Sequence, residues 1–205
     1  SAVLMVFDVL IIGGGVAGMQ CALVIGSGLK KPFAKSKKVG ILLHQRSSHL
    51  QNALFNNVLG LTSGTLGEDI LIQGKKQLTE NYSDVSQIEH EKVISIAKYN
   101  DLYIVKTNKN EFRSLIVVMA LNYAKPFTIK GLDDYIEPHQ RAKAVKDRIQ
   151  LKNKNYLVKK GLYVCGTLGG CRSQFAIAAG SGAIVATDIL TLWNDGEHTQ
   201  VHDKI

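Results

Sequence analysis

Residues 9–18 read VLIIGGGVAG, and this stretch decides the fold of the chain. The apolar run at residues 6–12 is typical of a parallel strand buried on both faces, and a helical pattern follows the glycines. Gly13, Gly15 and Gly18 form the spacing G-x-G-x-x-G between strand and helix. Gly13 allows a tight turn, Gly15 lets a pyrophosphate approach the backbone, and Gly18 lets helix and strand pack closely. Free N–H groups and the positive dipole end at the helix start then predict dinucleotide binding.

The second strand is predicted at residues 39–43, and it is not followed by the acidic residue that completes this fingerprint. In dinucleotide-binding units an acidic residue at this point holds a ribose hydroxyl. Here the strand runs into HQR at residues 44–46. His44 or Gln45 can offer a side-chain hydrogen bond instead, so both are candidate binding residues.

The rest of the chain alternates between helical and strand patterns. Residues 67–82 carry apolar residues at helical spacing, and residues 93–120 contain three strand-like segments separated by turns. The third segment returns to the main sheet at residues 115–119. A final strand within GLYVCGT, at residues 161–167, precedes a helix of small residues. These patterns predict an α/β fold, a Rossmann-like domain with a parallel sheet, helices and a three-stranded β-meander.

The composition sets further limits. The chain has 205 residues, 45% of them hydrophobic, which suffices for one sizeable domain. Three cysteines, none in a CxxC pair, argue against a disulfide scaffold and suit a reducing cytosol. Asp8 interrupts the apolar start, and the apolar stretch at residues 175–192 contains Asp188 and is shorter than the ~20 residues of a membrane span. We therefore expect a cytoplasmic protein without a membrane segment.

The formal net charge of +8 raises the question of nucleic-acid binding. The lysines gather in two predicted loops that lack interleaved aromatic residues and any recognisable nucleic-acid motif. We expect solvated loops and no nucleic-acid partner, with nucleic-acid binding as the alternative. The two clusters are Lys30, Lys31, Lys35, Lys37 and Lys38, then Lys152, Lys154, Lys159 and Lys160.

With these elements in this order, the chain resembles the FAD domain of the thioredoxin reductase family over residues 6–124 and 156–195. Residues 57–60 read NVLG, like the family's Asn-x-x-Gly element beside the flavin, and residues 90–93 correspond to the strand that straps the adenine. Gln174 keeps its place in the turn that opens the last helix, whose N–H groups face the flavin in the family. The resemblance implies FAD as the cofactor, held by Gly13, Gly15, Val16, Ala17, Gly18, His44, Gln45, Asn57, His90, Val93, Ala120, Gly166, Thr167, Gln174 and Phe175.

Three positions depart from the family pattern. Ala120 is followed by Leu121 and Asn122, where the family has an Ala-Thr-Gly turn. Thr167 follows Gly166 in place of the aspartate that holds the ribityl chain, so a hydroxyl replaces a carboxylate. Ser173 stands where the last helix of the family begins with arginine.

The segment between the two halves is short. From Ala120 to Gly161 it contains one glycine, Gly131, and no second G-x-G-x-x-G, although a βαβ unit needs about 30 residues and a glycine turn. We expect the nicotinamide domain and its CxxC pair to be absent. The prediction is a single FAD-binding domain over residues 1–205, built from 1–124 and 156–205. The connector at 125–155 is expected to include a short helix near residues 139–148.

Two functions remain open at this point. The first is a thioredoxin reductase-like, FAD-dependent oxidoreductase that receives electrons from a separate donor protein, or from a nicotinamide that docks without a domain of its own. The second is a non-catalytic nucleotide-binding or interaction module that kept the fold. No catalytic residue is assigned. Cys171, in a glycine-rich loop, is the one plausible redox thiol, whereas Cys21 and Cys165 are expected in the core.

Partners follow mainly from the resemblance, which implies a homodimer formed through FAD domains. Phe127, Ile129 and Tyr135 either cover surface exposed by the missing domain or pack the connector onto its own domain. No metal site is expected, because His198 and His202 are four apart but lie in a predicted tail.

Overall fold

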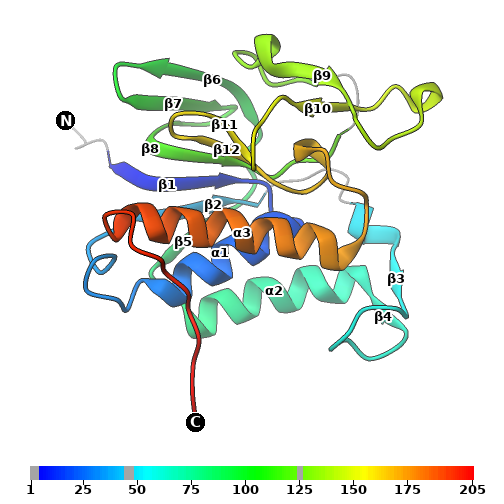
Figure 1. Ribbon diagram of the computed structural model, residues 1–205, viewed down its shortest axis with the longest axis horizontal. Helices are drawn as coiled ribbons and strands as arrows, with labels where there is room; N and C mark the ends of the chain where they lie inside the picture. Colours follow the sequence, from blue (N-terminus) through cyan, green and yellow to red (C-terminus); the bar gives the residue numbers. More distant parts are fainter. Residues whose placement is uncertain (1–4, 44–48, 124–126) are drawn as a thin grey trace.

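The computed structural model describes residues 5–43, 49–123 and 127–205, which form three layers (Figure 1). A mostly parallel sheet forms the middle layer. Three helices cover one face of this sheet, and the β-meander with a small two-stranded sheet lies over the other. The Rossmann-like α/β architecture expected from the sequence is confirmed.

Five parallel strands form the centre of the sheet in the order β12-β8-β1-β2-β5, and both halves of the chain contribute to them. In the middle, Leu10 lies between Gly40 of β2 and Val117 of β8. The carboxyl ends of the parallel strands therefore meet at one edge, where ligands bind in open α/β sheets. The strands are β1 (Val6–Ile12), β2 (Val39–Leu42), β5 (Val85–Ile88), β8 (Glu111–Met119) and β12 (Leu162–Val164), with β11 (Leu157–Lys159) antiparallel at the edge.

The β-meander is present as expected. β6 (Val93–Tyr99) pairs antiparallel with β7 (Leu102–Thr107), and β7 pairs antiparallel with β8. β8 takes part in both structures: Ser114 pairs with β7, and Val118 pairs with β1 and β12.

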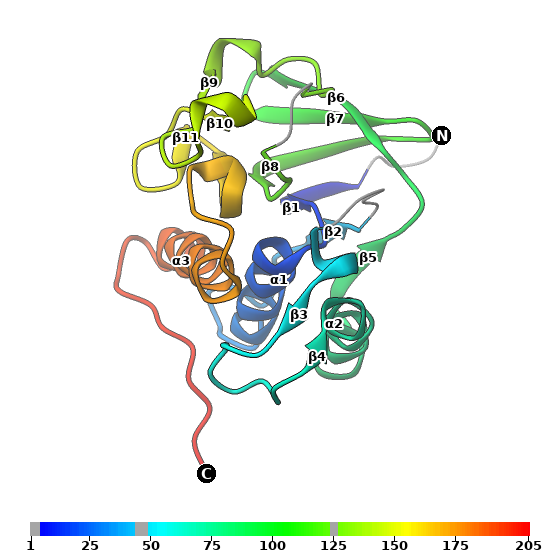
Figure 2. The same ribbon diagram turned by 90° about the vertical axis from the view of Figure 1, so that its right-hand side faces the viewer.

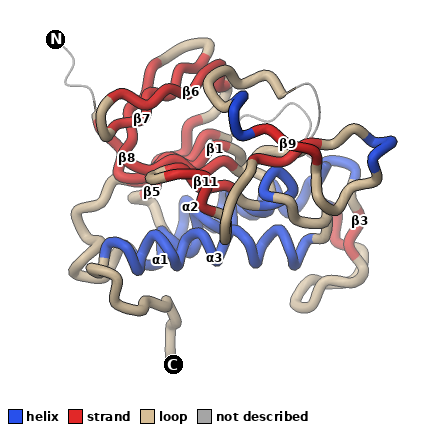
Figure 3. Tube along the Cα trace, turned by 45° about the horizontal axis from the view of Figure 1, so that its top comes forward, coloured by secondary structure: helices blue, strands red, loops and turns tan. Residues whose placement is uncertain are grey.

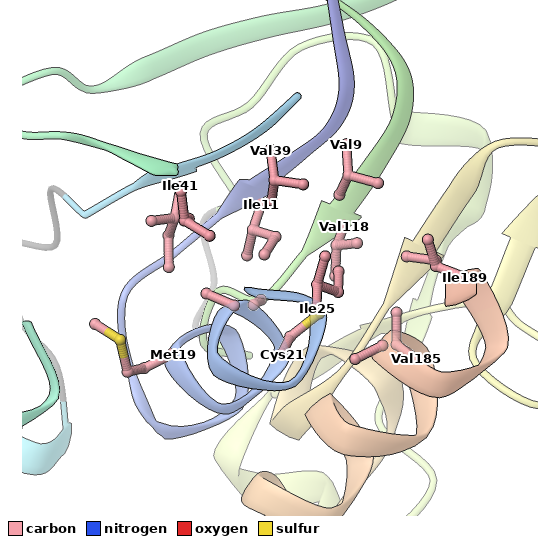
Figure 4. Packing of buried hydrophobic residues seen from close by; sticks show 14 of the residues in the cluster. Val9, Ile11, Met19, Cys21, Ile25, Val39, Ile41, Val118, Val185 and Ile189 are labelled. Carbon is pink, nitrogen blue, oxygen red and sulfur yellow. The ribbon is translucent and has the colours of Figure 1, made fainter. Parts of the chain in front are cut away.

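Three α-helices cover the other face. α1 and α3 pack in close contact, since a Cβ on Gly182 of α3 would lie only 2.1 Å from the carbonyl oxygen of Ala17 in α1. Figure 4 shows the core between them and the sheet, where Cys21 of α1 and Val185 of α3 are fully buried. The helices are α1 (Val16–Gly28), α2 (Gly67–Asn81) and α3 (Phe175–Trp193).

α3 extends one residue beyond the apolar stretch considered in the sequence. With 19 residues and a mean hydropathy of 1.7, it is long and apolar enough to cross a membrane by length and composition alone. Val185, Ile189 and Leu190 of this helix are nevertheless buried in the core that it shares with α1 and the sheet. A buried face of this kind is also what a core helix shows.

The expected helix near residues 139–148 is wrong. These residues instead join two antiparallel strands, β9 (Ile136–Pro138) and β10 (Ile149–Leu151), and contain only the single 3-10 turn η3 (Ala144–Lys146). Asp147 ends this turn in the left-handed region at φ +48°, which no continuing helix permits.

The connector packs onto its own domain. A second core lies on the other face of the sheet, beneath the β-meander. Ile129 is buried in it, and Phe127 and Tyr135 pack against it. The structure therefore favours the role in which these residues pack the connector onto its own domain. Lys130 also forms backbone hydrogen bonds with Ile94 and Ile96 of β6, at 3.0 and 2.9 Å.

Several short elements had no predicted counterpart. β5 is an edge strand with mixed side chains, and the hairpin of β3 (Leu54–Phe55) and β4 (Thr65–Leu66) has only two residues in each strand. The described residues also contain four 3-10 turns: η1 (His49–Asn52), η2 (Asp133–Tyr135), η3 and η4 (Gly166–Gly169).

Candidate functional site

A cavity of about 240 Å³ lies at the carboxyl edge of the sheet. Figure 2 faces this edge, with the ends of α1 and α3 near the centre, β9 and β10 above them and β3 and β4 below. The lining residues come from both halves of the chain: Gly15, Val16, Ala17, Leu50, Ala53, Phe55, Ala120, Leu121, Asn122, Gly166, Thr167, Ser173, Gln174, Phe175 and Ala178.

The glycine turn after β1 brings three elements close together. Gly13 has φ +117°, and a Cβ there would lie 2.4 Å from the carbonyl oxygen of Ala120, at the end of β8. A Cβ on Gly18 would lie 1.8 Å from the carbonyl oxygen of Gly13. The turn therefore needs glycine at both positions, as the fingerprint predicts.

The amino end of α1 opens onto the cavity without a side-chain cap. Gly15 is its N-cap, with an extended backbone, and the first turn contains no acidic residue. Val16 and Ala17 of that turn line the cavity. Because the first N–H groups of a helix have no partner inside the helix, they can bind an anion here.

The amino end of α3 also opens onto this cavity without a side-chain cap. Its N-cap, Gln174, forms no side-chain cap hydrogen bond, and the first turn again lacks an acid. In contrast, α2 does not line the cavity and carries Glu68 and Asp69 in its first turn. Among the helices described, the two that meet the cavity are thus the two whose positive ends no acidic side chain balances.

The third wall is the η4 turn. Gly166 adopts φ +71°, and its N–H donates to Oγ of Ser181 in α3 at 2.8 Å. That hydroxyl donates in turn to the carbonyl oxygen of Ala178 at 2.8 Å. These bonds fix η4, and with it Thr167, against the amino-terminal part of α3.

Side chains of the connector hold η4 from its other side. His139, which is buried, bonds through Nε2 to the carbonyl oxygen of Thr167 at 2.9 Å. Nδ1 of His139 accepts the backbone N–H groups of Arg141 and Ala142, so Nε2 carries the proton and donates. Arg141 donates to the carbonyl oxygen of Gly170 at 2.8 Å, and Asn153 to that of Gly169 at 3.1 Å.

These positioning residues were missed in the sequence, because their partners lie far along the chain and no local pattern links them. One signal was present. Gln150 stands between two apolar residues of a strand and is buried, and such an amide needs partners. It accepts the N–H of Gln140 at 2.9 Å and donates to Glu137 at 2.7 Å.

The β3–β4 hairpin provides the outer rim. The ring of Phe55 meets that of Phe175 edge to face, with centroids 5.1 Å apart. Asn57, the residue predicted for this segment, is exposed in the hairpin loop and does not line the cavity. The hairpin presents an aromatic ring there instead.

The predicted adenine-side residues are not gathered at this cavity. His44 and Gln45 lie outside the residues that the structure describes. His90 is exposed with φ +62°, and Val93 is buried in the second core. Between them, Glu91 accepts hydrogen bonds from Thr107 and Asn110, both at 2.7 Å, and fastens the meander.

None of the three cysteines lines the cavity. Cys21 and Cys165 are fully buried, as expected, and burial raises the pKa of both thiols. Cys171 is also buried, with its Sγ 3.7 Å from the hydroxyl oxygen of Tyr156.

No protein-family model matches this chain, and no curated protein matches it either. Solved structures do match. A thioredoxin reductase from Gloeobacter violaceus superposes with a TM-score of 0.70 at 14% identity, over 98% of each chain. The chain has the thioredoxin reductase fold.

Two further structures with this fold show the same likeness. A ferredoxin-flavin thioredoxin reductase from Clostridium acetobutylicum has a TM-score of 0.68 at 15% identity, over 94% of this chain and 99% of that one. An oxidoreductase from Agrobacterium tumefaciens has a TM-score of 0.67 at 13% identity, over 90% and 97%. At such identities the likeness concerns the fold, and function must be argued from the site.

Proposed function

We propose that this protein binds FAD in the cavity and acts as a thioredoxin reductase-like oxidoreductase. The observation that carries the proposal is the meeting of two uncapped helix amino ends, those of α1 and α3, at one cavity. A dinucleotide with a pyrophosphate and an electron-rich ring edge satisfies both ends at once.

The residues present fit the cofactor. The first N–H groups of α1, beside Gly15, suit the pyrophosphate. The hydroxyl of Thr167 suits the ribityl chain, and the N–H groups at Gln174 and Phe175 suit the pyrimidine edge of the flavin. Bound FAD supplies the redox chemistry, and the protein's part is to bind, orient and shield it.

We propose that the electrons come from a separate donor protein. The sequence between Ala120 and Gly161 has no second glycine fingerprint. Its described residues form the β9–β10 sheet, β11 and turns, and their apolar side chains at Ile129, Leu132 and Leu151 are buried in the core beneath the β-meander. A nicotinamide held in its own domain therefore has no place in this proposal.

The binding test uses one substitution at each of two helix starts. Gly15→Asp places a carboxylate at the N-cap of α1, where it bonds the amides that the pyrophosphate needs. Leu66→Asp makes the same change at the N-cap of α2; Leu66 belongs to β4, but neither it nor the first turn of α2 lines the cavity. We expect Gly15→Asp to weaken FAD binding by about 100-fold or more and Leu66→Asp to leave it unchanged. Equal effects, or wild-type protein that takes up no FAD, would contradict the proposal.

The non-catalytic module remains the second candidate, because Leu121, Asn122 and Thr167 replace polar or small family residues inside the cavity itself. Reduction of the bound flavin separates the two. Reduction by NADPH alone supports a reductase that needs no donor protein, and reduction only by a donor protein supports the proposal above. Bound FAD that neither reduces supports the module.

We further propose a homodimer in the cytoplasm, as the family resemblance implies. Sedimentation velocity should give the mass of two chains. A single species with the mass of one chain would contradict the dimer.

A further inference from the structure

The loop between β9 and β10, residues 139–148, is basic, and it projects from the molecule on the side where β3 lies (Figure 3). Phe55 of β3 lines the cavity. We propose that this basic loop is the docking surface for an acidic electron-carrier protein. The inference rests on the proposed function and gives the donor protein a chemical character and a place.

Charge is the first argument. The loop itself, residues 139–148, holds four Lys and Arg residues and one acidic residue, Asp147. The longer segment 136–160 contains eight Lys and Arg residues and two acidic residues, Glu137 and Asp147. Their net charge of +6 is most of the net +8 of the whole chain. Concentrated charge of one sign steers an oppositely charged partner and raises its association rate.

Exposure is the second argument. Lys143 and Lys146 are exposed, and no ion pair within the described ranges engages either of them. Val145 stands between them at 86% exposed. An exposed apolar side chain flanked by unpaired lysines is a feature of protein interfaces, where charges orient the partner and apolar contact stabilises it.

The position of the loop is the third argument. Its inner side holds the η4 wall through His139 and Arg141, while its outer side carries the free lysines. Arg172 is exposed two residues after Gly170, the residue that Arg141 contacts, and directly precedes Ser173 at the cavity. Arg172 thus adds an exposed cation between the residue that Arg141 contacts and the cavity, and a docked carrier would lie against the wall that contains Thr167.

The other lysine cluster differs in its place on the molecule, and two of its lysines contact other side chains. It lies before β2, at the amino ends of the parallel strands and so at the opposite edge of the sheet. There Lys30 pairs with Asp203, and Lys37 lies 4.0 Å from Asp8 and 5.5 Å from the Trp193 ring centroid. This cluster therefore serves as a control with similar composition in another place.

An acidic protein fits the basic loop better than a nucleic acid does. Single strands need aromatic side chains on which bases stack, and residues 139–148 contain none. Arg148 is also half-buried, with its guanidinium 5.0 Å from the ring centroid of Tyr123.

The proposed electron transfer balances: two reduced one-electron carriers each give up one electron, and FAD takes up two electrons and two protons from water.

The test compares two double charge reversals. Lys143→Glu/Lys146→Glu changes the basic loop, and Lys35→Glu/Lys38→Glu makes the same change in charge among exposed lysines of the control cluster. The probe is a purified acidic [2Fe–2S] ferredoxin, and its equilibrium binding to each FAD-free protein is measured at about 20 mM and about 200 mM salt.

We expect the loop variant to weaken ferredoxin binding about tenfold or more at low salt, and the control variant to change it less than about twofold. Equal effects of the two variants, no binding by the wild type, or tighter loop-dependent binding of random duplex DNA would overturn the proposal. Titration of each variant with FAD reads the proposed function separately, so a loss of FAD binding and a loss of docking are distinguishable.

Discussion

The amino end of α1 and the η4 turn form two walls of one cavity, and the molecule holds them in place by different means. The backbone of α1 packs directly against the backbone of neighbouring segments, and glycines permit this close approach. A Cβ on Gly18 or Gly182 would lie about 2 Å from a backbone oxygen. At η4 the backbone is held by side chains, with carbonyl oxygens that accept hydrogen bonds from His139, Arg141 and Asn153.

This difference has a consequence for how each wall tolerates change. Where backbone packs directly on backbone, an added methyl group cannot be accommodated, because protein interiors are close-packed. A set of hydrogen bonds can be removed one by one, each at a modest cost. We therefore expect a rigid α1 wall and an adjustable η4 wall.

The largest effect is expected at the α1 wall. Gly18→Ala places a methyl group 1.8 Å from the carbonyl oxygen of Gly13, so β1 and α1 must separate. We expect a loss of about 3 kcal/mol or more in the free energy of unfolding, measured by urea denaturation. The control is Gly180→Ala in α3, where no atom lies within 4 Å of the added methyl. There alanine should stabilise the protein by about 0.5–1 kcal/mol. A mild effect at position 18 would contradict the rigid wall.

A medium effect is expected from His139→Ala at the η4 wall. The change leaves the carbonyl oxygen of Thr167 and two backbone N–H groups without this partner. We expect a loss of about 2 kcal/mol in unfolding free energy and weaker FAD binding. His139→Gln should recover part of both, because its amide can donate to the same oxygen.

Lys143→Ala is the control for that measurement, since Lys143 is exposed in the same loop. It should change the unfolding free energy by less than about 0.5 kcal/mol. If the two alanine variants behave alike, His139 does not position η4.

A smaller effect is expected from Asn153→Ala. The side chain bonds the carbonyl oxygens of Leu151 and Gly169, at 2.7 and 3.1 Å, but it is half-buried, so water replaces part of the loss. We expect about 1 kcal/mol in the same denaturation measurement. A larger loss of unfolding free energy than that of His139→Ala would mean that Asn153, not His139, contributes most to holding η4 in place.

The smallest effect is expected in the labelling rates of two cysteines, which compare the two walls in the folded protein. Cys21 marks the α1 wall, and Cys171 follows the η4 turn. In His139→Ala, labelling of Cys171 by iodoacetamide should become faster by about tenfold, because a loosened wall opens locally. Labelling of Cys21 should stay negligible, since its burial raises the pKa of the thiol and leaves little reactive thiolate. Equal acceleration at both would indicate global opening.

The same difference explains how much could be predicted from the sequence. The α1 wall follows from local rules, because Gly13, Gly15 and Gly18 act within one strand–turn–helix unit. The meander was predictable for a similar reason, since its strands follow one another through short turns. The η4 wall depends on pairs such as His139 with Thr167, 28 residues apart. No local pattern encodes such a pair.

The errors have the same origin. The polar stretch at residues 139–148 was expected to form a helix, but pairing of β9 with β10 determines its path. Asn57, assigned to the flavin from the family resemblance alone, does not line the cavity, where the hairpin places Phe55 against Phe175, and its role in binding stays a prediction. His44 and Gln45 lie outside the residues described, so their role in binding stays a prediction.

The central claim is that the cavity between the two walls binds FAD, and calorimetric titration of the purified protein with FAD tests it most directly. We predict one FAD bound per chain with a Kd of about 10 μM or tighter, together with a yellow complex and a raised melting temperature. A titration without heat, with colourless protein and an unchanged melting temperature, would contradict the account.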